Sequence, residues 1–180
     1  MVRAGDTKGN AVAGDKMVLP REVEEVFREF RTCEFSTLAR DGTPITWPVV
    51  TLWRPEERQF VLTTSIGFPQ KAFNIRRNPR VSLLFSDPTA SGLENSPAVL
   101  VQGEAEAPER IRTSPNHLPE YWRRLFEIQP AGKMYGSNRP MRYLMDWYYM
   151  RLYVSVRPRR VLFWPEGDFA QAPLEVNHVG

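Results

Sequence analysis

The chain has 180 residues, of which 42% are hydrophobic and 25% are charged, and its formal net charge at pH 7 is +3. These values are ordinary for one globular domain of this length. The small positive excess is compatible with an anionic ligand but too weak to indicate a nucleic-acid-binding protein. No apolar run approaches the ~20 residues of a membrane span. We therefore expect neither a nucleic acid nor a membrane as a partner.

The first residues, MVRAGDTKGNAVAGDK, lack the apolar centre of a signal peptide. We therefore expect a cytoplasmic protein whose chain begins with a mobile tail. The predicted organisation is a tail over residues 1–16, one domain over 17–165 and a C-terminal extension over 166–180.

Cysteine and histidine are scarce. Cys33 is the single cysteine of the sequence, which excludes an intrachain disulfide and a cysteine-based metal cluster. We expect it to be a small buried apolar residue. The two histidines, His117 and His178, lie far apart in the sequence, so a Ser-His-Asp triad is poorly supported. No metal site is predicted, and the catalytic residues stay unknown.

Hydrophobic spacing predicts a first helix after Pro20, because Val23, Val26 and Phe27 recur on one helical face. From residue 34 the pattern changes to strands. The predicted strands cover 34–40, 43–53, 59–65, 80–87, 98–107, 149–157 and 159–165, with short helices over 69–77 and 118–128 and an irregular tail after 165. This content predicts a mainly β fold, one antiparallel β-barrel with helical decorations.

The second strand contains Pro44 and Pro48, and it follows a hairpin turn at Asp41–Gly42. Proline lacks a backbone N–H and is tolerated in a sheet only at an edge or at an irregular place. Pro48 therefore predicts a point where the strand turns its backbone toward something other than a neighbouring strand.

The stretch LTTSIGFPQK predicts a strand end with three hydroxyls, Thr63, Thr64 and Ser65, before a helix that starts near Pro69. Unpaired N–H groups at a helix start, hydroxyls and the charge of Lys71 together suit a phosphate. The alternative is that the hydroxyls cap the turn and that Lys71 is solvated. No P-loop or Rossmann motif is present.

The blocks FSTLARDGTPITWPVVTLW and FVLTTSIGFPQKAFNIRRNPRVSLLF resemble the pyridoxamine 5′-phosphate oxidase-like family, the split β-barrel flavoproteins. The resemblance covers residues 35–105. It implies a split β-barrel and a homodimer with FMN at the subunit interface. It also implies which residues bind the cofactor: backbone at Pro48, Val49, Val50 and Thr51 along the ring, Thr63, Thr64, Ser65, Gln70 and Lys71 near the phosphate, and Trp164 close to the ring.

The chain departs from family members that oxidise pyridoxamine phosphate, because Pro48 and Trp53 stand where those members carry an Arg and a Lys. We therefore expect an FMN-dependent oxidoreductase that is not a true pyridoxamine-phosphate oxidase. Its substrate contacts are expected in the loops 89–97 and 131–140.

Two alternatives stay open. The first is a deazaflavin-dependent reductase on the same fold, with Arg76, Arg77 and Arg80 meeting the cofactor's acidic tail. The second is a flavin- or haem-binding protein without enzymatic activity. Haem is the least supported ligand, since no histidine lies in the block that carries the resemblance.

Overall fold

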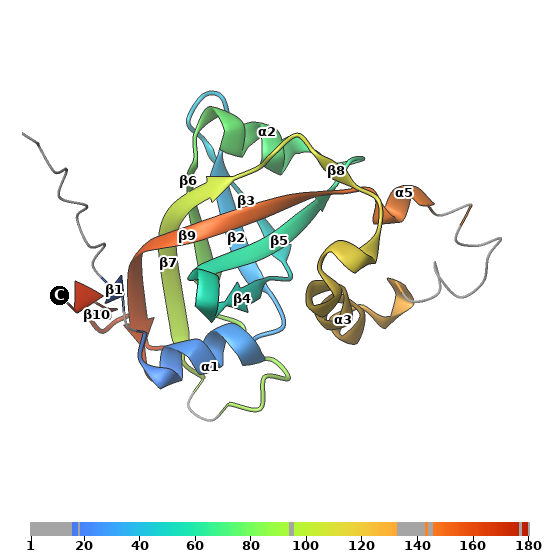
Figure 1. Cartoon of the computed structure of the whole chain (residues 1–180). Helices are drawn as coiled ribbons and strands as arrows, with labels where there is room; N and C mark the ends of the chain where they lie inside the picture. Colours follow the sequence, from blue (N-terminus) through green and yellow to red (C-terminus); the bar gives the residue numbers. More distant parts are fainter. Residues whose placement is uncertain are drawn as a thin grey trace, which may run out of the picture.

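The computed structural model describes residues 16–17, 19–93, 96–132, 143, 146–176 and 178–179. Its centre is an antiparallel sheet in the order β3-β2-β6-β7-β9-β5-β4, which curls on itself (Figure 1). These strands are β2 (Cys33–Leu38), β3 (Pro44–Val49), β4 (Leu52–Arg54), β5 (Gln59–Ser65), β6 (Arg80–Phe85), β7 (Ala98–Glu106) and β9 (Arg151–Trp164). The predicted mainly β fold, a split β-barrel, is confirmed.

Four helices described by the structure surround the sheet: α1 (Arg21–Glu29), α2 (Gln70–Arg77), α3 (Pro119–Ile128) and α5 (Asp146–Tyr149). Short 3-10 turns cover Pro55–Glu57 and Pro115–His117. The helices predicted after Pro20, near Pro69 and over 118–128 are confirmed. In Figure 1, α1 lies across one end of the barrel and α2 across the other. No helix among the described residues is long and apolar enough to cross a bilayer.

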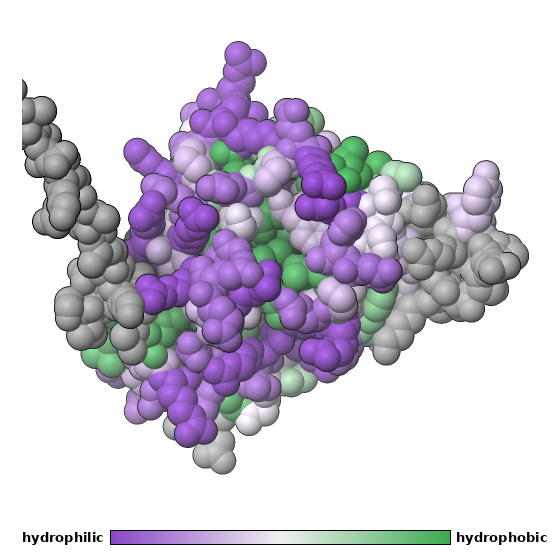
Figure 2. Space-filling model, viewed as in Figure 1, coloured by the Kyte–Doolittle hydropathy of each residue, from purple (hydrophilic) through white to green (hydrophobic). Residues whose placement is uncertain are grey.

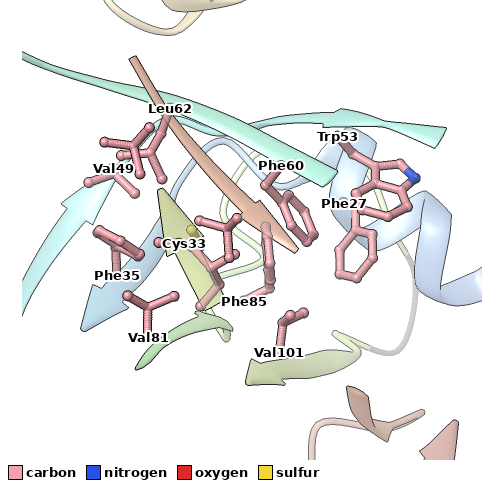
Figure 3. Packing of buried hydrophobic residues seen from close by; sticks show 14 of the residues in the cluster. Phe27, Cys33, Phe35, Val49, Trp53, Phe60, Leu62, Val81, Phe85 and Val101 are labelled. Carbon is pink, nitrogen blue, oxygen red and sulfur yellow. The ribbon is translucent and has the colours of Figure 1, made fainter. Parts of the chain in front are cut away.

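The barrel interior is filled by side chains that alternate along the strands. On β7, Val99, Val101 and Ala105 are buried. Gln102 and Glu104, which alternate with buried residues, are exposed, as the alternation predicts. Figure 3 shows Phe27 of α1 inserted among the strand residues, and its ring centroid lies 4.7 Å from that of Phe60. Trp53 and Cys33 belong to the same buried cluster. The predicted burial of Cys33 is confirmed.

The strand predicted over 43–53 is wrong as one element. It breaks at Val50 and Thr51 into β3, which pairs with β2, and β4, which pairs with β5. These two strands are the two ends of the sheet order. Pro48 is therefore on an edge strand, where a proline, which lacks a backbone N–H, is tolerated. The break carries the chain from one edge of the split barrel to the other.

The two last predicted strands form one long strand, β9. Gly103 of β7 pairs with Pro158 and Gln102 pairs with Arg160, so Arg159 has no partner on β7 and forms a bulge. A Cβ on Gly103 would lie 2.4 Å from the Arg157 carbonyl oxygen, so only glycine allows this close approach. The bulge lets β9 continue past Pro158, which separated the two predicted strands.

The tail after residue 165 is not wholly irregular. Strand β10 (Leu174–Val176) pairs with β9, and β11 (His178–Val179) pairs with β1 (Lys16–Met17). Strand β8 (Ile111–Arg112) also pairs with β9. Each end of β9 has one edge that its main ladders leave unpaired, and β8 and β10 add there. The predicted domain limits at residues 16 and 165 stay a prediction.

Candidate functional site

A cavity of about 540 Å³ opens where the break between β3 and β4 meets the end of β5 and the start of β9. Seven of the ten cofactor-binding residues predicted from the sequence line it. These are Pro48, Val49, Val50, Thr63, Thr64, Ser65 and Lys71. Residues separated by more than a dozen positions in the sequence thus meet in one pocket, whose lining includes apolar residues, hydroxyls and a cation.

The other three predicted residues do not line the pocket. Thr51 is buried, and its hydroxyl lies 4.0 Å from the Cys33 sulfur. Gln70 is exposed at the start of α2, and its amide donates a hydrogen bond to Asn74. Trp164 ends β9, whereas the pocket lies at the beginning of that strand, and its indole N–H donates to the Gln171 carbonyl. A contact of Trp164 with a cofactor therefore stays a prediction that needs another subunit.

Two of the predicted hydroxyls stabilise the turn between β5 and α2. The Thr64 hydroxyl donates to the Phe68 carbonyl at 2.8 Å, and the Ser65 hydroxyl accepts the Gly67 N–H at 3.2 Å. The alternative of ordinary turn capping is thus correct for these two side chains. A hydroxyl that accepts one hydrogen bond can still donate its own hydrogen. The turn fixes both oxygens at the pocket rim.

Lys71 is not a solvated surface lysine. It is half-buried, and its Nζ lies 4.6 Å from the centroid of the Trp47 ring. Burial lowers the pKa of Lys71 from its usual 10.5, and the positive charge of Arg151 lowers it further. The ammonium therefore shares the pocket with a second cation whose charge it is repelled by.

Arg151 is the second cation of the pocket, and the sequence did not indicate it. It is the first residue of β9 and pairs with Ser65 across the ladder. Its Nε donates to the Tyr148 carbonyl at 2.8 Å, and its guanidinium lies 4.6 Å from the Tyr148 ring centroid. No Asp or Glu is found among the described residues that line the pocket. The site therefore has a local positive charge, which favours an anionic ligand.

Helix α3 forms a wall of the pocket through Tyr121 and Leu125, and Gln129, which caps the helix, adds to it. The Tyr121 hydroxyl accepts a hydrogen bond from Thr63 at 3.2 Å and donates one to the Val50 carbonyl at 3.4 Å. Burial raises the pKa of Tyr121, so the phenol stays protonated. The same side chain thus links the irregular segment after β3 to the end of β5.

Arg124 holds the far side of this wall against α1. Its guanidinium donates to the carbonyls of Arg28 and Phe30, which end that helix. Helical spacing had predicted only that α3 packs through an apolar face. Its hydrogen bonds could not be foreseen, because their partners lie about 60 to 95 positions earlier in the chain.

The other predicted residues lie outside the pocket. Arg76 donates to the carbonyls of Ala107 and Pro108, and Arg77 donates to the Asn74 side chain. Arg80 lines a different cavity, of about 590 Å³, on the outer face of the barrel. The two loops expected to contact substrate, 89–97 and 131–140, both lie partly outside the described residues.

Several solved structures share this fold. A conserved hypothetical protein from Mycobacterium tuberculosis is 25% identical with a TM-score of 0.55, and the match covers 95% of this chain and 98% of that one. An F420 reductase is 21% identical with a TM-score of 0.52, covering 80% and 98%. A heme binding protein from Mycobacterium smegmatis is 20% identical with a TM-score of 0.55, covering 89% of this chain but 60% of that one. At such identities the last two likenesses show the fold alone.

A sequence search among curated proteins finds no match. The family model described as pyridoxamine 5′-phosphate oxidase matches residues 19–163. This range holds the barrel from α1 through β9, except the last residue of β9, and every residue of the pocket discussed above. The chain therefore belongs to the pyridoxamine 5′-phosphate oxidase family.

Proposed function

We propose that this protein binds FMN in the pocket between β3, β5, β9 and α3, and that it is an oxidoreductase acting on a small molecule. The observation that carries the proposal is that one pocket combines two kinds of lining. The segment Pro48–Val50 is apolar, and the same pocket holds Lys71 and Arg151 with no carboxylate among the described lining residues. FMN has two matching parts, a flat ring system and a phosphate.

The donor set fits this ligand. Lys71 and Arg151 offer charge-assisted hydrogen bonds to a phosphate, and Ser65, which pairs with Arg151 across the ladder, adds a hydroxyl to the pocket lining. Val50 and Thr51 lie outside both ladders, so this backbone is not committed to sheet pairing. The cavity volume is within the range of small-molecule sites. Bound FMN would supply the electron-transfer chemistry, and the chain would supply orientation and electrostatics.

A deazaflavin is the second candidate, supported by the structural likeness to an F420 reductase. Haem is less well supported. Its usual protein ligands are His, Cys, Met or Tyr, and of the described lining residues only Tyr121 and Tyr148 are of these types. The Tyr121 hydroxyl is already hydrogen-bonded to Thr63 and Val50. A flavin- or haem-binding protein without enzymatic activity stays the third candidate.

We also propose that the protein is a homodimer in which a second copy covers the pocket. The family resemblance motivates this proposal, and exposed aromatic residues support it. Phe68 at the pocket rim is 73% exposed and Trp147 of α5 is 48% exposed. Figure 2 shows hydrophobic surface in the region of β8 and the end of β5, surrounded by hydrophilic residues. Light scattering should give twice the chain mass of 20.8 kDa, and a monomer at micromolar concentration would refute the dimer.

Absorption spectra of the purified protein, before and after incubation with FMN, test the cofactor. FMN gives two bands near the visible edge, a deazaflavin one main band and haem a Soret band. We expect FMN to bind with quenched fluorescence, and NAD(P)H or a chemical reductant to bleach the bound ring. Failure to bind FMN together with retention of a deazaflavin would replace the first candidate by the second. Failure to bind any ring compound would overturn the proposal.

A further inference from the structure

Both cations of the pocket lie on aromatic rings, where a surface cation commonly has a carboxylate partner. The Lys71 ammonium is 4.6 Å from the Trp47 ring centroid. The Arg151 guanidinium is 4.6 Å from the Tyr148 centroid and 5.7 Å from that of Trp122. Trp47 and Tyr148 both line the pocket.

Elsewhere in the described part of the chain, arginines do pair with acids. Arg160 binds Glu175 through two hydrogen bonds, and Arg159 binds Glu104 at 2.7 Å. No ion pair described by the structure includes Lys71 or Arg151. Lys71 and Arg151 thus differ from Arg159 and Arg160 in that their described partners include aromatic rings and no carboxylate.

The difference has an electrostatic consequence. A carboxylate partner would orient a cation but cancel its charge, whereas the face of an aromatic ring attracts a cation through its quadrupole and carries no net charge. Trp47 and Tyr148 therefore hold Lys71 and Arg151 in place while both formal charges persist. The repulsion between these charges, which also lowers the pKa of Lys71, is relieved when an anion lies between them.

We infer that Trp47 and Tyr148 are positioning residues that preserve a doubly positive site, and that this site selects a doubly charged phosphate monoester over a singly charged diester. The inference rests on the proposed function and narrows it. A phosphate monoester carries about two negative charges at pH 7, with a second pKa of about 6. A phosphodiester carries one. The site therefore favours FMN over any ring cofactor whose phosphate is esterified twice.

The test uses three ligands with the same ring: FMN, the methyl ester of FMN and riboflavin, which carry about two, one and no phosphate charges. Their dissociation constants are measured by fluorescence quenching with the full chain. The expected order of affinity is FMN, then the ester, then riboflavin. FMN affinity should fall as the pH drops below about 6, where its phosphate takes up a proton, while riboflavin affinity stays constant.

Three variants separate positioning from structure. Trp47→Leu should raise the dissociation constant of FMN about 2- to 30-fold, the range that corresponds to a cation–π contact, and leave that of riboflavin unchanged. Trp47→Phe should recover part of the loss. Arg151→Gln should bring FMN and its methyl ester to nearly equal affinity. Arg80→Gln, which removes the same charge at the other cavity, should change none of these ratios.

The outcomes are distinguishable. If the wild type binds FMN and its methyl ester equally, the selection of a double charge is wrong although the proposed function stands. If Trp47→Leu weakens FMN and riboflavin by the same factor, Trp47 is structural and the inference is again overturned. If the wild type binds none of the three ligands, the proposed function itself fails. Because ligands are compared within each variant, partial misfolding cannot imitate the expected ratios.

Discussion

Replacing Lys71 by methionine should weaken FMN binding and at the same time stabilise the ligand-free protein. Methionine keeps an unbranched side chain of similar length against Trp47 and removes the charge alone. Without a ligand the ammonium is half-buried and repelled by the charge of Arg151, so its charged form is disfavoured. With phosphate present the same charge becomes favourable. One substitution is thus expected to act in opposite directions on folding and on binding.

The magnitude follows from the exposure of the ammonium. A hydrogen bond to a charged group contributes about 1.5–3 kcal/mol. Because Lys71 is half-exposed, solvent screening favours the lower part of this range, about 1.5–2 kcal/mol. This corresponds to a dissociation constant for FMN about 10- to 30-fold higher. Riboflavin, which lacks the phosphate, should bind both proteins equally.

The effect on stability depends on pH with a definite sign. Between the lowered pKa of Lys71 and its usual 10.5, the unfolded chain binds more protons than the folded one, so stability rises with pH there. Below that window the penalty on the wild type is fully present, and above it the penalty is gone. Lys71→Met should therefore be more stable than the wild type near neutral pH, and the difference should vanish as the pH approaches 10.5.

The assay combines FMN and riboflavin titrations with urea unfolding of the ligand-free protein at several pH values, and Arg80→Gln serves as the charge-matched control. Equal losses of FMN and riboflavin affinity would show that Lys71 is not a phosphate ligand. A ligand-free variant that is less stable than the wild type at neutral pH would refute the argument that the buried ammonium is a cost. The turn hydroxyls and Lys71 would then be ordinary turn chemistry.

Three further outcomes follow from contacts elsewhere. Gly103→Ala should destabilise the fold by about 1–3 kcal/mol in urea unfolding, because the new Cβ would meet the Arg157 carbonyl at 2.4 Å. The control Gly42→Ala has open space around it and should cost only the strain of its φ of +87°, about 1 kcal/mol. Equal losses of stability in the two variants would argue against the clash at Gly103. Tyr121→Phe should lower the free energy of unfolding by about 1–3 kcal/mol, since it leaves the buried Thr63 hydroxyl and the Val50 carbonyl without this partner. Hydrogen exchange should also accelerate in the segment between β3 and β4. Unchanged stability would show that α3 does not hold that segment. Burial raises the pKa of the Cys33 thiol well above its usual range, so a thiol reagent should modify it only in denaturant, and rapid labelling of the folded protein at pH 8 would contradict its burial.

Local sequence pattern was sufficient for most elements of the fold. Alternation on β7 and helical spacing in α1 and α3 predict both the element and its buried face, because each depends only on residues a few positions apart. The turn before α2 was also predicted, since Gly67 and Pro69 act on their own neighbours. The ten cofactor-binding residues were implied by the family resemblance, and the seven that lie in one pocket belong to two short segments of the chain.

Tertiary structure decided what surrounds those segments. Arg151 lines the same pocket as Lys71 because the β5–β9 ladder places it opposite Ser65. That register is set by burial of alternate residues along both strands and not by anything near residue 71. Tyr121 reaches Thr63 and Val50 because α3 folds back over the barrel, about 60 to 70 positions further along the chain. The break between β3 and β4 lies where the chain passes from one edge of the sheet to the other. These two strands become opposite edges only because β9 lies between β5 and β7 in the folded sheet. The charge of Lys71 is known from the sequence alone. Its surroundings depend on which strands pair: the Trp47 ring, a second cation, Arg151, and no carboxylate among the described lining residues.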